Sequence, residues 1–306
     1  ATEAAALQAG RYLGLGDRHA AHQAATHAMF DALHQVDIDG HIVIGEEGRL
    51  GEHSPLDSGR KVGTGNGPAV DVMADSIDGI GLVVKGLPGA MSVVGIAPQG
   101  TVWSPQPAIY MDKIVVDREA AGVLVTDCMG APPAWTLAII ARAKGKEIRD
   151  LQVKVLDRPR HENLVEDIRR TGARVLLCPE GDTSGALIAT MPGVGADVLM
   201  GVGGVPEGVT AACAVNASRG AMLGRLAPQS DEERAAIKSA GLNIGQVLTC
   251  DELVSSQYSF FAATGITDGP LLSGVEFHGK RAKTYSLILR GETGIRRMLQ
   301  TQHFLD

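Results

Sequence analysis

Apolar residues recur at helical spacing along the first part of the chain. The pattern over residues 4–36 predicts helix with an interruption at 14–17, and Ala25, Met29 and Leu33 fall on one face. Four short apolar runs follow, each ending in turn or loop residues, which predicts four strands. These runs cover residues 41–44, 69–74, 81–85 and 91–97, and their close succession indicates a β-meander that ends at 98–100.

After Tyr110, short strand patterns alternate with helical patterns. The predicted strands cover 123–125, 153–156, 175–177 and 198–200, and the predicted helices cover 161–171 and 184–191. This alternation is typical of an α/β fold. The charged stretch 144–150 precedes a new strand, so we expect an N-terminal lobe at 1–149 and a C-terminal lobe at 150–306, packed as one functional unit. The polar segment 227–233 is predicted to be an exposed loop.

Composition narrows the class of protein. The 306 residues are 44% hydrophobic, enough for one large core or two packed lobes. A net charge of −7, with both signs mixed along the chain, argues against nucleic acid or an anionic membrane as a partner. No run approaches the roughly 18–20 apolar residues that cross a bilayer, and residues 1–10 do not resemble a signal peptide. We therefore expect a cytoplasmic protein with reduced, buried thiols at Cys128, Cys178, Cys213 and Cys250.

Two acidic clusters each follow a predicted strand. Glu46 and Glu47 follow one strand, Asp75 and Asp78 follow the next, and Glu207 lies in a glycine-rich segment further on. Hard divalent cations prefer oxygen ligands, and two-metal sites hold their ions about 3.5–4 Å apart. Loop carboxylates are more often simply solvated, so the spacing alone leaves a metal site and a solvated surface as alternatives.

A basic segment has a similar position in the pattern. Arg158 and Arg160 come directly after a predicted strand and precede a helix. Arginine binds phosphate oxygens in a bidentate manner, and a helix N-terminus adds a favourable dipole. The alternative is a solvated helix start without a ligand. Asp182 occupies the same kind of position, where it could accept hydrogen bonds from sugar hydroxyls or only cap the helix.

Seven segments together resemble the class II fructose-1,6-bisphosphatases, within the inositol monophosphatase-like sugar phosphatase superfamily. The resemblance runs over nearly the whole chain. It implies a layered α-β-α-β-α sugar-phosphatase fold in two lobes, hydrolysis of a sugar phosphate monoester, Mg²⁺ or Mn²⁺ as one or two cofactor ions, and a homo-oligomer. The segments are Ile42–Glu46, Lys61–Gly65, Ala69–Asp71, Ile109–Lys113, Asp157–His161, Gly201–Gly208 and Phe261–Gly269.

The resemblance also assigns roles to residues of this chain. The positions that match the family's metal ligands and catalytic carboxylates are Glu46, Asp75, Asp78 and Glu207, with His22 at a further ligand position. The positions that match substrate contacts are Tyr110, Lys113, Arg158, Arg160, Gly181, Asp182 and Gly204.

Several positions depart from the family's pattern. His22 stands where the family has Asp, which lowers the expected affinity for Mg²⁺ and makes Mn²⁺ or Zn²⁺ more suitable. The family motif D-P-x-E-G-T reads Asp75-Ser-Ile-Asp-Gly-Ile80 here, so the hydroxyl expected to orient the attacking water is missing. Glu180 replaces an Asp that contacts the sugar. The segment 44–59 is one residue longer than its counterpart, so the family's second Glu has no certain equivalent.

Three functions are compatible with these residues. The first is a metal-dependent phosphatase with a shifted sugar-phosphate substrate. The second is an enzyme that uses the sugar-phosphate pocket for isomerisation or dehydration, with His22 or Glu47 as acid or base. The third is a catalytically silent regulatory paralogue, because a fold alone does not determine chemistry. Retention of the carboxylates together with Arg158 and Arg160 favours a remodelled active site over a lost one.

Overall fold

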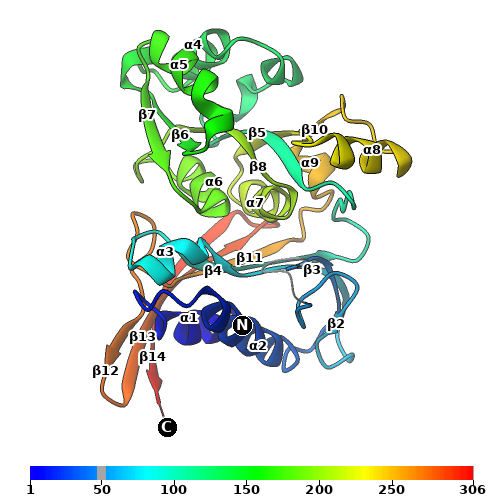
Figure 1. Ribbon diagram of the computed structural model, residues 1–306, viewed down its shortest axis with the longest axis vertical. Helices are drawn as coiled ribbons and strands as arrows, with labels where there is room; N and C mark the ends of the chain where they lie inside the picture. The colour runs from blue at the N-terminus through cyan, green and yellow to red at the C-terminus, as the bar shows by residue number, and fades with distance from the viewer. Residues whose placement is uncertain (47–52, 306) are drawn as a thin grey trace. The chain divides into compact units, whose positions relative to one another are not determined.

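The chain divides into two compact units, one inserted into the other. The computed structural model describes residues 1–46 and 53–305. Unit 1 consists of Ala1–Val102 and Ser256–Asp306, and unit 2 consists of Trp103–Ser255. Each unit has its own sheet and its own helices (Figure 1).

Unit 1 is built on a mixed sheet with the strand order β12-β13-β11-β4-β3-β1-β2, and β14 pairs with β13. Strands β1 and β3 are parallel, whereas β3 and β4, β4 and β11, and β11 and β13 are antiparallel. The strands are β1 (Asp39–Ile44), β2 (Lys61–Val62), β3 (Ala69–Asp78), β4 (Met91–Pro98), β11 (Phe260–Gly265), β12 (Glu276–His278), β13 (Arg281–Arg290) and β14 (Ile295–Phe304). The helices are α1 (Thr2–Gly10), α2 (Arg18–Leu33) and α3 (Ile80–Lys85).

The core of unit 1 lies between its sheet and the two N-terminal helices. Figure 1 shows α1 and α2 along one face of the sheet, and the contacts of α1 with β3, β4 and β11 agree with this arrangement. Alanine side chains, such as Ala5 and Ala9, let α1 approach the strands closely, and Met29 of α2 fills the same core. Asp17 begins α2 by accepting a hydrogen bond from the backbone N–H of Ala20 at 2.9 Å, which satisfies one free donor of the first turn.

Unit 2 has a second mixed sheet with the strand order β10-β9-β5-β8-β6-β7. Its strands are β5 (Tyr110–Val116), β6 (Gln152–Leu156), β7 (Arg174–Cys178), β8 (Val198–Gly204), β9 (Ala221–Leu226) and β10 (Val247–Thr249). Its α-helices are α4 (Pro133–Ala143), α5 (Glu162–Arg170), α6 (Asp182–Thr190), α7 (Val205–Ala217), α8 (Asp231–Ser239) and α9 (Cys250–Leu253). Short 3-10 helices are η2 (Ala121–Val123), η3 (Thr126–Met129), η4 (Ile148–Asp150) and η5 (Pro159–His161).

Strand β5 has protein on both of its faces. Ile114 and Val116 belong to the hydrophobic cluster that also contains residues of α4 and α5. Side chains alternate along a strand, so Met111 and Lys113 point to the other face, where α6 and α7 pack. The chain is therefore layered α/β, as predicted.

Two predicted strands are wrong, and one pairing differs from the predicted meander. Residues 81–85 belong to helix α3, because Gly79 and Gly86, with φ of 92° and 67°, begin and end a single helical stretch. A short apolar run does not distinguish strand from helix by periodicity alone. Residues 123–125 form the end of η2 and its link to η3 instead of a strand. Strands β1 and β3 are parallel, so their C-terminal ends lie at the same edge of the sheet.

The predicted lobe boundary at 149/150 falls inside unit 2, in η4 and before β6. Strand β5 accounts for this difference, since its pairing with β8 and β9 ties the chain after Trp103 to unit 2. The predicted exposed loop 227–233 also needs correction. Ser230 caps α8 by accepting a hydrogen bond from the backbone N–H of Glu233. Glu233 is buried, and the N–H groups of Ile109, Tyr110 and Gln229 donate to its carboxylate.

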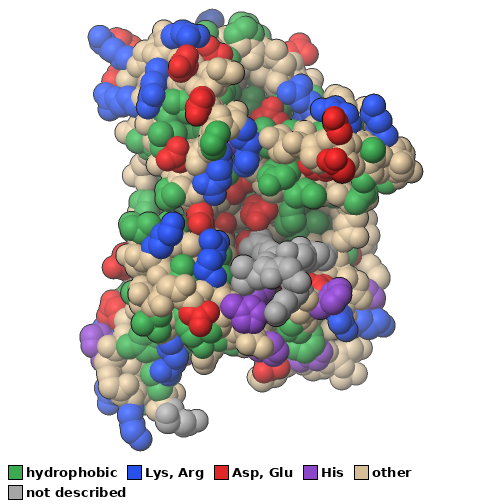
Figure 2. Space-filling model, viewed as in Figure 1, with side chains coloured by type: hydrophobic (Ala, Val, Ile, Leu, Met, Phe, Trp, Pro, Cys, Tyr) green, Lys and Arg blue, Asp and Glu red, His purple; other side chains and the backbone are tan. Residues whose placement is uncertain are grey.

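The surface and the thiols agree with the composition. Figure 2 shows basic and acidic side chains intermixed over the visible face. All four cysteines are free and buried, as predicted. Among the described residues, no helix combines the length and the apolarity that a membrane span requires.

Candidate active site

The ends of β1 and β3 bring Glu46 and Asp75 to one edge of the unit 1 sheet. The parallel register pairs Ile44 with Met73, so the residues two positions further along each strand are neighbours. Gly45, between Ile44 and Glu46 in the sequence, has to be a glycine, because a Cβ atom there would lie 2.1 Å from the carbonyl oxygen of Leu56. The same Leu56 carbonyl accepts the backbone N–H of Glu46 at 3.2 Å. These contacts fix the position of the Glu46 backbone, from which the side chain extends.

The two carboxylate oxygens of Glu46 have different partners. Oε1 accepts the backbone N–H of Ser76 at 2.6 Å and the Ser76 hydroxyl at 2.8 Å. Oε2 lies 2.8 Å from Nε2 of His22 on α2. The Thr26 hydroxyl, one turn further along α2, lies 3.1 Å from the Ser76 hydroxyl. A network therefore connects α2, the end of β1 and β3 around one buried carboxylate.

Asp75 and Asp78 lie on either side of an irregularity in β3. The register with β4 shifts between Asp75 and Asp78, and both carboxylates are buried, each with 3% exposure. Gly79 follows in the left-handed conformation, and Ile80 begins α3 with its side chain packed against the core of unit 1. The position of the expected hydroxyl thus carries an apolar side chain that belongs to the packing of the helix.

The donors of unit 1 fit a hard divalent cation by their chemistry. Glu46, Asp75 and Asp78 are buried carboxylates, which are costly to keep ionised without compensating charge or hydrogen bonds. His22 adds a nitrogen donor at the same place. Within residues 1–46 and 53–305, however, no group of three or more His, Cys, Asp or Glu side chains is already arranged as a cation site. Glu47 lies outside the described residues.

Unit 2 buries an ion pair between two candidate substrate-binding residues. Lys113 on β5 and Asp182 at the start of α6 form a hydrogen-bonded salt bridge, and their side chains are 1% and 8% exposed. Gly203 on β8 leaves the space for this pair, since a Cβ atom there would lie 1.9 Å from Oδ2 of Asp182 and 2.6 Å from Nζ of Lys113. The pair and the glycine form one packed unit, and Gly203 is a residue that the sequence reasoning did not single out.

A methyl group at Gly203 is therefore expected to displace the ion pair. We expect Gly203→Ala to lower the free energy of unfolding by about 1–3 kcal/mol or more, as overpacking of a filled interior does. Gly130→Ala is the matched control, because no heavy atom lies within 4 Å of a Cβ there and the backbone is not in the left-handed region. Denaturant titration of both variants checks this prediction, and equal midpoints for the two would contradict it.

Arg160 and Tyr110 also come together in unit 2. The guanidinium carbon of Arg160 lies 5.1 Å from the centre of the Tyr110 ring, and its Nε and Nη2 donate to the carbonyl of Val202 at 3.2 and 2.9 Å. Arg158 is half-buried, and its Nη1 donates to the neighbouring carbonyl of Asp157. The structure therefore holds Arg160 in a defined position, whereas the side chain of Arg158 has only a local backbone contact.

His161 explains how Arg160 is held. The backbone N–H of Val202 donates to Nε2 of His161 at 2.8 Å, so the proton of the neutral ring is on Nδ1, which donates to the carbonyl of Leu156 at 2.7 Å. A Cβ atom at Gly201 would lie 2.9 Å from Nε2 of His161, so the ring also needs this glycine, which has a φ of 122°. His161 thus joins the end of β6 to β8. Sequence reasoning noted its position beside the arginines but not this role.

Burial lowers the pKa of His161, and the lowered value predicts acid sensitivity. The unfolded chain binds a proton as the pH falls below about 6.5, while the folded protein resists protonation. The contribution of the neutral His161 ring to the free energy of unfolding is therefore fully present above that pH. It is lost as the pH falls through the lowered pKa of His161. We expect the metal-free protein to lose more thermal stability between pH 7.5 and 5 than its His161→Asn variant does. His34→Asn, which removes an exposed imidazole, is the control and should follow the wild-type slope.

Two glycines place the remaining candidates at helix starts. Gly181, with a φ of 90°, precedes α6, and Gly204 precedes α7. Glu207 lies in the first turn of α7, and a Cβ atom at Gly204 would lie 1.9 Å from its Oε2. Thr183 donates to the carbonyl of Glu207 at 3.4 Å, which connects the two helix starts. Of the predicted site residues, unit 2 contains Tyr110, Lys113, Arg158, Arg160, Gly181, Asp182, Gly204 and Glu207, and unit 1 contains His22, Glu46, Asp75 and Asp78.

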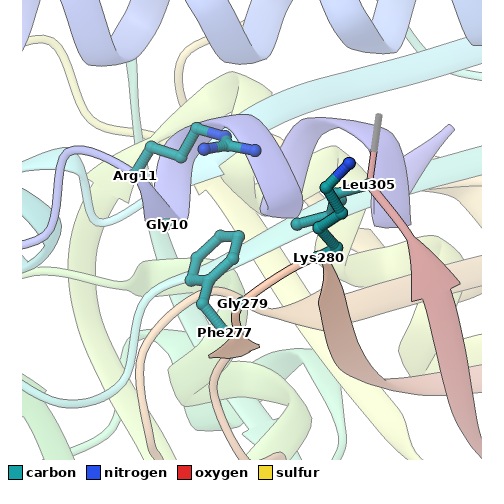
Figure 3. Close-up of a pocket in the computed structure, with 6 residues that line it drawn as sticks. All are labelled: Gly10, Arg11, Phe277, Gly279, Lys280 and Leu305. Carbon is teal, nitrogen blue, oxygen red and sulfur yellow. The ribbon is translucent and has the colours of Figure 1, made fainter.

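A separate pocket lies in unit 1 and contains none of the candidate residues. It measures about 470 Å³ and is lined by Gly10, Arg11, Phe277, Gly279, Lys280 and Leu305. Figure 3 shows Arg11 and Phe277 at one part of this pocket and Lys280 at another. The guanidinium carbon of Arg11 lies 5.3 Å from the centre of the Phe277 ring.

Comparison with known proteins gives consistent matches over the full chain. The family described as bacterial fructose-1,6-bisphosphatase, glpX-encoded, matches residues 1–303. The fructose-1,6-bisphosphatase 1 class 2 of Escherichia coli (strain K12) is 38% identical over 318 aligned residues, which cover 100% of this chain and 93% of the relative. The fructose-1,6-bisphosphatase class 2 of Shigella flexneri matches with the same identity and coverage.

Proposed function

Since this chain belongs to the family of bacterial, glpX-encoded fructose-1,6-bisphosphatases and is a sugar-bisphosphate phosphatase, we propose that carboxylates of unit 1 hold the divalent cation its reaction requires. The family is one of metal-dependent phosphatases. The observation that supports the proposal is the convergence of Glu46 and Asp75 at one edge of the sheet, with Asp78 close by in sequence and equally buried. The same match disfavours the isomerase, dehydratase and silent-paralogue alternatives.

The proposed ligands are Glu46, Asp75 and Asp78, with His22 as a nitrogen donor, and Glu207 is proposed as a ligand from its match to the family alone. A bound cation supplies charge neutralisation for the phosphoryl group and acidity for the attacking water. An oxygen-rich set suits Mg²⁺ or Mn²⁺, and the imidazole of His22 makes Zn²⁺ a further candidate. One or two ions are compatible with this number of donors.

The residues of unit 2 are proposed to bind the sugar phosphate. Arg160, held by Val202 and the Tyr110 ring, presents a fixed positive charge to phosphate oxygens. Arg158 and the Lys113–Asp182 ion pair are proposed as further substrate contacts, with Asp182 accepting hydrogen bonds from sugar hydroxyls next to Gly181 and Gly204. The names of the relatives point to fructose 1,6-bisphosphate as the substrate. The homo-oligomer and the cytoplasmic location stay predictions.

Phosphate release from a panel of sugar mono- and bisphosphates tests the proposed function. Each substrate is assayed with Mg²⁺, Mn²⁺, Zn²⁺ and EDTA in parallel. We expect release from fructose 1,6-bisphosphate or a related bisphosphate that depends on the cation and stops with EDTA. Release that persists unchanged in EDTA would contradict the proposed cation chemistry. If no substrate releases phosphate although a sugar phosphate binds in calorimetry, the phosphatase assignment fails for this chain.

A further inference from the structure

One residue supplies two of the hydrogen bonds that hold the Glu46 carboxylate. Ser76 donates its backbone N–H at 2.6 Å and its hydroxyl at 2.8 Å, and both reach the same oxygen, Oε1. Ser76 is 0% exposed and Glu46 is 1% exposed. Hydrogen bonds to a charged acceptor are stronger than neutral ones, and burial increases their strength further. Ser76 therefore fixes one oxygen of this buried carboxylate.

The hydroxyl of Ser76 is itself oriented by its surroundings. It lies 3.1 Å from the Thr26 hydroxyl, which in turn lies 2.6 Å from the carbonyl of His22. The hydroxyls of Ser76 and Thr26 have one hydrogen each, but together they make three contacts: Ser76 with Glu46, Ser76 with Thr26, and Thr26 with the carbonyl of His22. The carboxylate of Glu46 is the strongest acceptor among them. The Ser76 hydrogen therefore goes to Glu46, and Thr26 can donate to either of its own neighbours. Thr26 supports the arrangement from α2 without touching Glu46.

Ser76 stands at one of the positions where the chain departs from the motif D-P-x-E-G-T. A proline has neither a backbone N–H nor a hydroxyl, so it could supply neither of the two bonds to Oε1. His22, another departure, contacts the second oxygen of the same carboxylate. Two departures that are 54 positions apart in the sequence thus act on one side chain. Ser76 and His22 therefore contact the two oxygens of the Glu46 carboxylate from different segments of the chain.

We propose that Ser76 is a positioning residue that pins Oε1 of Glu46 and thereby directs Oε2, the oxygen next to His22, for cation binding. The inference rests on the proposed function, because it assumes that Glu46 is a ligand. Partners that orient a ligand typically contribute a factor of about 10–100 to metal affinity.

Direct titration of Mn²⁺ into the full chain, followed by electron paramagnetic resonance of the free ion, tests this inference without measuring turnover. We expect Ser76→Ala to raise the dissociation constant about 10-fold, since it loses the hydroxyl but keeps the N–H. Ser76→Pro loses both donors and should raise the constant further, towards 100-fold. Thr26→Val keeps the shape of the side chain and all bonds to Glu46, so it should change the constant less than 3-fold.

The outcomes separate the inference from the proposed function. If the wild-type chain binds no Mn²⁺, the proposed function fails first. If the wild type binds and Ser76→Ala binds equally well at a temperature where both are folded, Ser76 does not position Glu46. A lower melting temperature of Ser76→Ala with an unchanged Mn²⁺ constant would show a purely structural role and would also overturn the inference. A loss in Thr26→Val as large as in Ser76→Ala would do the same, because it would assign the effect to packing of α2.

Discussion

Asp75→Asn is expected to lower cation-dependent phosphate release by about 10²–10³-fold, the loss typical when one group that stabilises charge in the transition state is removed. Asp75 lies in the last part of β3, beside the end of β1, and is 3% exposed. The amide keeps the shape of the side chain but removes the negative charge that a cation needs. Phosphate release over a range of Mn²⁺ concentrations measures the loss and separates weak cation binding from slow turnover.

Asp71→Asn is the matched control on the same strand. Asp71 is as buried as Asp75, but its Oδ2 accepts the backbone N–H groups of Gly100, Thr101 and Val102. Its role is to hold the turn after β4, so its replacement should lower the melting temperature and leave turnover of the folded enzyme close to that of the wild type. An Asp75→Asn enzyme with wild-type turnover at every Mn²⁺ concentration would remove Asp75 from the proposed site.

Lys113→Met is expected to lower the free energy of unfolding of unit 2 by about 3–5 kcal/mol, the usual cost of leaving one partner of a buried ion pair alone. Lys113 and Asp182 are both almost fully buried, and they fill the space that the missing side chain of Gly203 leaves. Methionine has a similar length and fills the same volume, so the change tests the charge and not the packing. Urea unfolding followed by circular dichroism gives the measurement.

The double variant Lys113→Met with Asp182→Asn provides the internal control. Removing both charges removes the uncompensated carboxylate, so stability should return by more than half of the loss. Binding of a sugar phosphate should stay weak in both variants if Lys113 and Asp182 contact the substrate. An unfolding midpoint of Lys113→Met equal to that of the wild type would show that Asp182 finds another partner or is protonated.

Residues with a strong local pattern were predictable from the sequence. The interruption between α1 and α2, strands β1, β3, β4, β6, β7 and β8, and helices α5 and α6 follow from periodicity and from turn residues. The acidic residues at strand ends were predictable for the same reason. Parallel pairing of β1 with β3 was not, because the intervening segment carries no signal for its direction. That pairing is what makes Glu46 and Asp75 neighbours.

The roles of Ser76, His161 and Gly203 could not be found in the sequence alone. Each depends on a contact between segments that are distant in the chain: Ser76 with Glu46, His161 with Val202, and Gly203 with Lys113 and Asp182. The type of residue gives a weak signal in each case, since serine, histidine and glycine have many uses. Only the packed structure shows which use applies, and in all three cases the residue shapes the surroundings of a candidate site residue.

The insertion of unit 2 between the two parts of unit 1 has a consequence for synthesis on the ribosome. Strand β4 pairs with β11, and Ile96 lies opposite Phe260, so the sheet of unit 1 stays open at β4 until more than 160 further residues have been made. Unit 2 is complete at Ser255, before β11 exists, and can fold first. During that interval the nascent chain exposes the open edge of β4 and part of an apolar core, which is the kind of surface that chaperones bind. Folding of this enzyme in the cell therefore ends with the closing of its N-terminal unit by its last strands.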